Sequence, residues 1–304
     1  MKKPSLIKAI IKTMRPKQYP KNGVLFAALV FDRQLLNRAA FERTFAGFII
    51  FCLLSSAVYF INDILDIESD RQHPEKKNRP IASGALPVST AAAVAVILLL
   101  IAFPAAWLLS PSFAAICAVY FLMNLAYSKW LKHIPLLDVL IIAAGFVLRV
   151  AGGVTLIAVQ RFSPWLYIVI TLGALYIGFG KRRAELSLLA ESASSHRRVL
   201  DGYTLPLLDQ LITVVSSTTI VAYSLYTFSA PNLPENHTMM LTIPFVIYGI
   251  FRYLYLIQVK NCGGAPEEML FTDRPLQFTI LLWGAAVLTR SEEHTSELQS
   301  RFGI

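Results

Sequence analysis

The sequence has few cysteines and few charged residues, and it has fewer acids than bases. Its three cysteines, Cys52, Cys117 and Cys262, form no pair at metal-binding or redox spacing, so neither a disulfide framework nor a zinc site is indicated. Only 15% of the residues are charged, whereas 55% are hydrophobic. This composition excludes an ordinary soluble domain and predicts a polytopic membrane protein.

Long apolar runs follow one another along nearly the whole chain. A transmembrane helix needs roughly 20 apolar residues to cross the hydrocarbon layer of a bilayer. Candidate spans lie near residues 22–31, 44–61, 88–109, 112–127, 136–157, 164–180, 206–229, 241–257 and 275–288. We therefore expect an all-α bundle of nine transmembrane helices, with residues 1–288 forming one domain.

The last sixteen residues, 289–304, change abruptly from apolar residues to Ser, Glu, Gln and Arg. The string Ser291–Ser300 resembles translated sequencing-adapter read-through at the end of an assembled gene. We expect this segment to be a disordered tail or an artefact that has no part in the function, although a genuine polar tail is the alternative.

Lys and Arg residues alternate between crowded and sparse segments. With the N-terminus inside, the inner segments hold twenty of the 28 Lys and Arg residues, and the outer loops hold only Arg33, Arg38, Arg43 and Arg161. Cytoplasmic loops collect positive charge, so we expect the N-terminus and the polar segments on the cytoplasmic side of the cell membrane. The net charge of +9 then reflects topology and attraction to anionic lipids, and no nucleic-acid partner is expected. No feature of the sequence indicates the oligomeric state.

An acidic cluster follows the second apolar run. In a continuous helix, Asn62, Asp63, Asp66 and Asp70 would fall within an arc of roughly 100°. Like charges at these spacings repel each other, and a divalent cation would remove that repulsion. Because Mg2+ is held by one or two carboxylates together with substrate phosphates, these four residues are predicted to bind a magnesium diphosphate. The alternative is a solvated helix end with ordinary acids.

Polar residues in the other inner segments are candidates for binding phosphate groups or orienting a substrate. They are Lys21 and Asn22, Arg79, Tyr127 and Lys132, Asp138 and Arg149, Lys181, Arg182 and Glu185, and Arg197 and Tyr203. Arg149 lies inside a predicted span, where an ionisable group is costly and therefore a functional candidate. Three of these groups have a structural alternative: Arg79 as an inside-positive marker, Arg149 in a structural ion pair with Asp138, and Lys181 and Glu185 as a surface pair.

The pattern Asn62-Asp63-x-x-Asp66-x-x-x-Asp70 is similar to the first aspartate-rich motif of the UbiA superfamily of intramembrane prenyltransferases. The resemblance extends over nearly the whole chain. It implies nine transmembrane helices around a cavity open to lipid, with two polar motifs on cytoplasmic caps that bind magnesium and diphosphate. The segments 15–22, 127–138, 146–149 and 181–185 look like the decaprenyl-phosphate phosphoribosyltransferase branch. The second cap, residues 181–205, departs from the common pattern because it lacks a clean Asp-x-x-x-Asp and is rich in Lys and Arg.

This branch resemblance implies an enzyme that transfers phosphoribose from phosphoribosyl diphosphate to a polyprenyl phosphate, with Mg2+ as cofactor and diphosphate as product. The aspartates at 63, 66 and 70 would hold the donor diphosphate through Mg2+. The implied phosphate-positioning residues are Lys21, Arg149, Lys181 and Arg182, and those orienting ribose or cations are Tyr127, Lys132, Asp138 and Glu185.

Two other functions compete with this interpretation. The first is a UbiA-type prenyltransferase that moves a prenyl group from prenyl diphosphate to an aromatic acceptor; its expected second acidic motif is weak here. The second is a membrane transporter or lipid-binding protein whose intramembrane charges line a path. Broken helices near the midplane are typical of transporters, whereas these acids gather at one surface.

Overall fold

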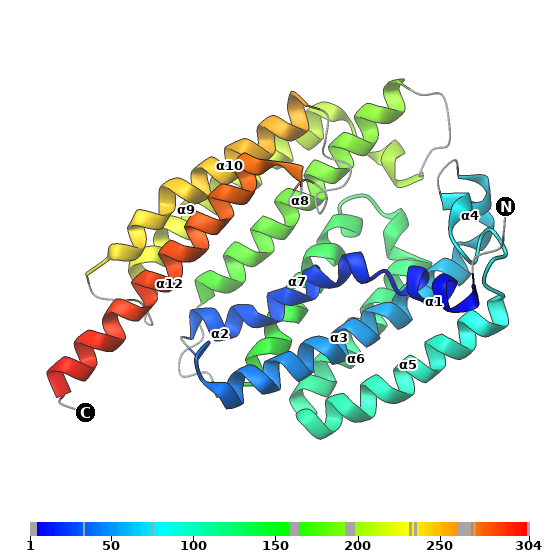
Figure 1. Cartoon of the computed structure of the whole chain (residues 1–304). Helices are drawn as coiled ribbons and strands as arrows, with labels where there is room; N and C mark the ends of the chain where they lie inside the picture. Colours follow the sequence, from blue (N-terminus) through cyan, green and yellow to red (C-terminus); the bar gives the residue numbers. More distant parts are fainter. Residues whose placement is uncertain are drawn as a thin grey trace. The chain divides into compact units, whose positions relative to one another are not determined.

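The computed structural model describes residues 5–32, 34–73, 76–158, 164–191, 198–230, 233, 236–260, 269 and 272–302. Every regular element in these residues is a helix, which confirms the all-α expectation (Figure 1). The α-helices are α1 (Leu6–Met14), α2 (Ala27–Phe31), α3 (Arg38–Leu65), α4 (Ile67–Gln72), α5 (Val88–Leu109), α6 (Pro111–Lys129), α7 (Leu137–Val154), α8 (Pro164–Glu191), α9 (Leu205–Ser229), α10 (Ile243–Gln258) and α12 (Arg274–Phe302). The short 3-10 segments are η1 (Pro16–Phe26), η2 (Lys76–Asn78), η3 (Leu131–His133), η4 (Arg198–Gly202) and η5 (Thr238–Thr242).

The chain divides into two compact units. Unit 1 comprises residues 1–29, 34–141 and 148–158, and unit 2 comprises residues 30–33, 142–147 and 159–304. The acidic motif, η1 and both ends of α7 therefore belong to unit 1, and the Lys- and Arg-rich segment after residue 180 belongs to unit 2. The expectation that residues 1–288 form one domain stays a prediction.

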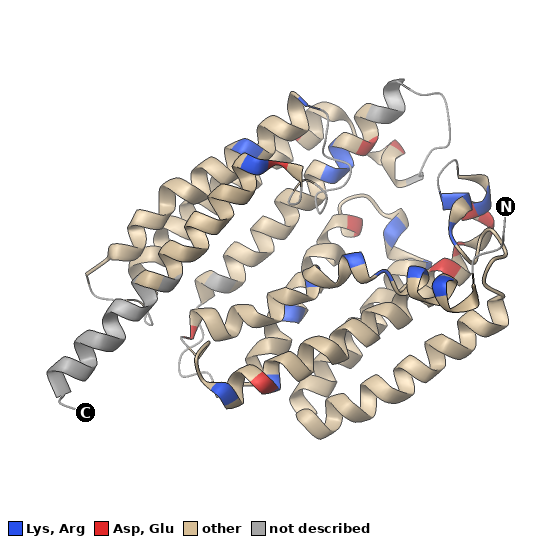
Figure 2. Ribbon diagram, viewed as in Figure 1, with Lys and Arg blue, Asp and Glu red and all other residues tan. Residues whose placement is uncertain are grey.

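In unit 1, α1, η1, α5 and α6 all pack against α3. Asn37 begins α3, because its side chain accepts a hydrogen bond from the Ala40 N–H at 3.2 Å and satisfies a donor of the first turn. In the most apolar window of α3, 61% is buried, against 22% in α5. Figure 2 shows no charged residue along α5. Thus α3 forms the core of unit 1, and α5 directs apolar side chains outward, as lipid contact requires.

Residues 16–31 differ from the expected first span. Pro16 and Pro20 lie in the 11-residue η1, where the fixed φ and missing N–H of each proline oppose a regular α-helix. The five residues of α2 follow, and alone they are too short to cross a ~30 Å hydrocarbon layer. The backbones of η1 and α7 meet closely, since a Cβ on Gly153 would lie 2.1 Å from the Leu25 carbonyl oxygen. Glycine is therefore required at this contact.

In unit 2, α8 packs along α9, and α10 packs along α12. Thr204 begins α9 by accepting a hydrogen bond from the Leu207 N–H at 3.3 Å. Arg252 on α10 donates through Nε and Nη2 to the two oxygens of Asp273, at 3.1 and 2.7 Å. Asp273 also accepts from the Leu276 N–H at 2.9 Å. This carboxylate therefore caps α12 and ties it to α10.

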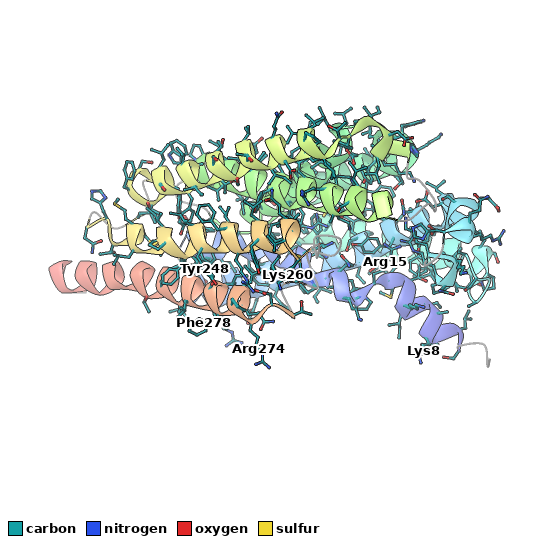
Figure 3. All side chains as sticks on the ribbon, turned by 90° about the horizontal axis from the view of Figure 1, so that it is seen from above. Lys8, Arg15, Tyr248, Lys260, Arg274 and Phe278 are labelled. Atoms are coloured by element: carbon teal, nitrogen blue, oxygen red, sulfur yellow. The ribbon has the colours of Figure 1, made fainter. Side chains whose placement is uncertain are left out.

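Within the described residues, six segments are long and apolar enough to cross a membrane: α3, α5, α6, α7, α9, and Thr238–Gln258, which contains α10. Tyr248 of α10 and Phe278 of α12 show the outward apolar surface of unit 2, with exposed fractions of 48% and 64% (Figure 3). The spans expected near 164–180 and 275–288 fall on α8 and α12, and α12 continues to Phe302. The count of nine spans, and the separate status of the tail, stay predictions.

Candidate active site

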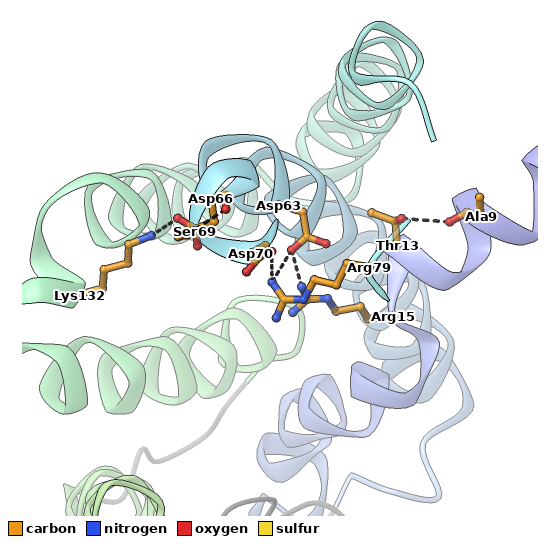
Figure 4. A network of polar contacts seen from close by, with 9 residues as sticks. All are labelled: Ala9, Thr13, Arg15, Asp63, Asp66, Ser69, Asp70, Arg79 and Lys132. Atoms are coloured by element: carbon orange, nitrogen blue, oxygen red, sulfur yellow. Dashed lines mark hydrogen bonds and ion pairs between the residues drawn. The ribbon is translucent and has the colours of Figure 1, made fainter. Parts of the chain in front are cut away.

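Two buried carboxylates, Asp63 at the end of α3 and Asp70 in α4, share one arginine (Figure 4). They are 2% and 3% exposed. Nη1 of Arg79 donates to Asp63 Oδ1 at 3.1 Å and to Asp70 Oδ2 at 2.7 Å. Nη2 of Arg15 donates to the same Asp63 oxygen at 2.5 Å. Because an unpaired buried charge is strongly unfavourable, these arginines stabilise the acidic pair.

Asp66 has a separate partner. Its backbone, with φ −95° and ψ 8°, is the junction between α3 and α4, although its N–H still donates to the Asn62 carbonyl at 2.9 Å and its carbonyl accepts from the Asp70 N–H at 2.8 Å. Its side chain is 25% exposed and forms an ion pair with Lys132 of η3. Figure 4 shows Asp66 directed to Lys132, whereas Asp63 lies toward the arginines. The three carboxylates of the expected arc thus have different cationic partners: Asp63 and Asp70 share Arg79, and Asp66 pairs with Lys132.

The acidic pair suits a magnesium ion that arrives with a diphosphate. Within the described residues, no three Asp, Glu, His or Cys side chains lie close enough together to hold a metal ion. Mg2+ needs only one or two carboxylates when phosphate oxygens and water complete its coordination. Asp63 and Asp70 already contact one cationic nitrogen, Nη1 of Arg79. The donor set therefore fits Mg2+ in combination with substrate phosphates.

Polar contacts continue from the acids along the face of α3 that η1 covers. The hydroxyls of Tyr19 and Ser56 lie 2.9 Å apart. Asn22, which is 1% exposed, donates through Nδ2 to the Ser55 hydroxyl at 3.2 Å and to the Cys52 sulfur at 3.3 Å. Two side chains of η1, those of Tyr19 and Asn22, thus attach this segment to α3.

Arg149 of α7 joins this polar line inside unit 1. Its Nε donates to Asn22 Oδ1 at 2.8 Å, and its Nη2 donates to the Tyr120 hydroxyl at 2.9 Å. Its guanidinium carbon lies 4.8 Å from the centre of the Tyr120 ring. Arg149 is 7% exposed and Asp138, at the start of the same helix, is fully buried. Both side chains therefore face the interior, as the spacing of eleven residues predicts.

The expected cap residues of unit 2 lie near the C-terminal part of α8. Arg182 is 2% exposed and donates to Glu185 at 2.6 Å. Arg183 donates to Asp209 of α9 at 2.6 Å. Lys181 is half-buried. The ion pair of Glu185 is thus made by Arg182, whereas a surface pair with Lys181 was the alternative considered from sequence.

The remaining expected residues lie on several elements of the two units. Lys21, Asn62 and Tyr127 are half-buried on η1, α3 and α6. Tyr203 follows η4 and is 4% exposed. Arg197 lies outside the described residues. Substrate contacts by these residues stay predictions.

Arg15 is the residue that sequence analysis did not select. It lies between α1 and η1 in a left-handed conformation, with φ 55° and ψ 59°. An arginine followed by proline at the start of the polar segment 15–22 is the only sequence signal that indicates it. Its partner Asp63 is 48 residues away, a separation at which helical periodicity carries no information.

Known proteins resemble the chain over most of its length. The model of the UbiA prenyltransferase family matches residues 24–272. A decaprenyl-phosphate phosphoribosyltransferase of Mycobacterium tuberculosis (strain CDC 1551 / Oshkosh) is 33% identical over 293 residues, which cover 93% of this chain and 94% of the relative. The enzyme of the same name from Mycolicibacterium smegmatis is 35% identical over 303 residues, covering 93% of each chain.

Solved structures share the fold. A UbiA homolog from Archaeoglobus fulgidus, bound to GPP and Mg2+, matches 92% of this chain and 99% of its own chain, with a TM-score of 0.71 and 17% identity. The same homolog bound to DMAPP and Mg2+ has a TM-score of 0.70. The family match and the six apolar segments found within the described residues make the protein a multi-pass membrane protein. The chain belongs to the UbiA prenyltransferase family.

Proposed function

We propose that the protein transfers 5-phosphoribose from phosphoribosyl diphosphate to a polyprenyl phosphate and releases diphosphate. The observation that carries this proposal is the 33–35% identity, over 93% of the chain, to decaprenyl-phosphate phosphoribosyltransferases. The basic cap after residue 180 supports it, because a reaction between two phosphorylated substrates needs more cations than aromatic prenylation does.

The acidic pair is the proposed donor site. Asp63 and Asp70 would hold the diphosphate through Mg2+, with Asn62 and Asp66 as further ligands. Mg2+ would supply positive charge to the departing diphosphate. Arg79 and Lys132, which already contact the carboxylates, would contact diphosphate oxygens and the ribose phosphate.

The reaction exchanges one C–O bond for another. An oxygen of the lipid phosphate forms a bond to the anomeric carbon, while the bond from that carbon to the diphosphate oxygen breaks and the electron pair leaves with diphosphate. The acceptor phosphate is ionised near pH 7, so no residue has to act as a general base. The chain's own contribution is to position the two anions and to neutralise their repulsion.

The acceptor phosphate needs cations separate from those of the donor. Within unit 2, Lys181, Arg182 and Arg197 of the basic cap would supply such cations. Lys21 and Arg149 of unit 1 would position or neutralise phosphate groups. Tyr127, Asp138, Glu185 and Tyr203 would orient the ribose or these cations. The distribution of Lys and Arg supports a location of this site on the cytoplasmic side of the cytoplasmic membrane.

Transfer of label from phosphoribosyl diphosphate to lipid tests the proposal. Purified protein is incubated with radiolabelled donor, polyprenyl phosphate and Mg2+, with and without EDTA. We expect label in the lipid phase that EDTA abolishes. Absence of lipid label, combined with alkylation of an aromatic acid when prenyl diphosphate is supplied, would assign the protein to aromatic prenylation. That alternative is worth testing because the structural relatives are bound to GPP and DMAPP.

A further inference from the structure

The side chain of Arg15 covers a buried carboxylate. Arg15 is 27% exposed at its side chain, whereas Asp63 beneath it is 2% exposed. Its guanidinium also lies over the Tyr59 ring, 4.8 Å from the centre. The neighbouring helix α1 is attached close by, since Lys12 donates to the Asn78 carbonyl at 3.3 Å, one residue before Arg79. Any cation that binds Asp63 must therefore share this carboxylate with Arg15 or displace it.

The backbone of Arg15 is held in an unfavourable state. A left-handed conformation is uncommon for residues other than glycine, and a following proline favours extended backbone in the residue before it. Such strain persists only where surrounding contacts require it, and it gathers at functional sites. Among the contacts that hold Arg15 are its backbone hydrogen bonds with Lys12 and Gln18 and its ion pair with Asp63.

The charges of this cluster balance. Two buried carboxylates, Asp63 and Asp70, meet two guanidinium groups, Arg15 and Arg79. Free Mg2+ would be repelled by the arginines, and free diphosphate would be repelled by the carboxylates. When Mg2+ and diphosphate bind together, the carboxylates can contact the metal and the arginines can contact the phosphate oxygens. Arginine can bind such oxygens in bidentate geometry.

We propose that Arg15 exchanges partners: it neutralises Asp63 while the site is free of metal, and it turns to the diphosphate when Mg2+ and diphosphate bind together. The inference rests on the proposed function, since it concerns the same donor site. It makes Arg15 a competitor of Mg2+ and a ligand of diphosphate. Binding of the two ions is then strongly cooperative, and neither is held firmly alone.

Calorimetric titration of the purified full chain with Mg2+ alone, and equilibrium dialysis of labelled inorganic diphosphate at saturating Mg2+, test the two halves of the proposal. In the wild type we expect weak binding of Mg2+ alone. Arg15→Gln should tighten binding of Mg2+ alone and weaken binding of diphosphate with Mg2+, each by roughly tenfold or more, because one charge-assisted hydrogen bond is removed. Arg15→Lys keeps the charge and should give intermediate diphosphate affinity with little change for Mg2+ alone.

Two further variants separate the proposed role of Arg15 from poor folding and from general effects of removing an arginine. Arg15→Gly relieves the left-handed strain while removing the guanidinium, so it should show the same opposite shifts even where Arg15→Gln folds poorly. Arg38→Gln is the matched control, because Arg38 begins α3, the helix that carries Asp63, its side chain is 91% exposed and it pairs with Glu42 on the same helix; it should change neither affinity.

Parallel losses of affinity for both ions in the Gln and Gly variants would show a merely structural role and overturn the proposal, as would parallel gains. Diphosphate binding does not depend on the group that the donor carries. Opposite shifts together with no phosphoribosyl transfer would therefore remove the proposed function and leave the exchange by Arg15 standing.

Discussion

The acids of the motif differ in how deeply they are buried, and this decides how each tolerates substitution. Asp63 is 2% exposed and accepts hydrogen bonds from two arginines, whereas the side chain of Asp66 is 25% exposed and has one lysine partner. Removing Asp63 leaves two guanidinium groups without their shared acceptor. Removing Asp66 leaves only Lys132, which can reach solvent or a substrate phosphate.

Substitution of single acids should separate folding from chemistry. Asp66→Ala is expected to lower phosphoribosyl transfer by roughly a hundredfold or more, because one electrostatic contact to the leaving group is lost, with little change in stability. Asp63→Ala should lower activity as much and also destabilise the fold by about 3–5 kcal/mol, because it breaks a buried ion pair. Turnover and thermal unfolding in detergent measure both effects. Full activity in Asp66→Ala would refute its role in the donor site.

At the scale of elements, side chains at helix ends tie neighbouring helices together. Arg43 near the start of α3 donates to the Leu156 carbonyl at 3.0 Å and to the Leu109 carbonyl at 2.8 Å, so one arginine binds the ends of α7 and α5. Positive charge at helix C-termini is favourable. In unit 2, the bidentate pair of Arg252 and Asp273 connects α10 to α12 in a comparable way.

The pair in unit 2 predicts a dependence on pH. Hydrogen bonds donated by Arg252, and then by the Leu276 N–H, lower the pKa of Asp273 below its usual 3.8. The folded protein therefore binds this proton less readily than the unfolded chain, so the stabilisation is complete above pH 3.8 and is lost as the pH falls through the lowered pKa.

This effect can be measured as the melting temperature between about pH 3 and 6, a range that includes the ordinary pKa of Asp. The wild type should melt higher than Asp273→Asn at pH 6, and the difference should shrink below pH 3.8. Glu42→Gln removes an acid of an exposed pair with Arg38 and should change the melting temperature little at any pH. A difference for Asp273→Asn that is constant across the range would contradict the prediction.

At the scale of the whole molecule, the accessibility of the native cysteines to a thiol reagent tests the orientation of the chain in the membrane. Cys52 and Cys117 lie in membrane-spanning helices and are 4% and 1% exposed. Cys262 lies outside the described residues, in a segment that the positive-inside distribution places on the cytoplasmic side. The side of the membrane that carries Cys262 can therefore be identified without introducing a new residue.

We expect a membrane-impermeant maleimide to label the protein in inverted membrane vesicles and not in intact cells. Cys262→Ser should abolish this labelling, because the two remaining thiols are buried. Labelling of intact cells that Cys262→Ser removes would reverse the proposed orientation and place the acidic site on the outer side.

The lengths of the apolar runs predicted most of the helices, since run length is a local property of the sequence. The runs 88–109 and 206–229 coincide with α5 and α9 to within one residue. The run expected as a first span became η1 and α2, because the contacts of Tyr19 and Asn22 with α3 hold this segment in place. Its prolines were visible in the sequence, but those contacts were not.

The sequence by itself determined that this protein is an all-α membrane protein with an acidic motif at the end of a span, because composition and run length act within a single helix. The tertiary structure alone decided which cation meets which acid. Arg15 meets Asp63 across 48 residues, and Lys132 meets Asp66 across 66. It also placed Asp66 at a helix junction, where its cationic partner differs from those of the buried pair. Such pairings follow from the packing of distant segments and the need to neutralise buried charge, and neither is encoded in local periodicity.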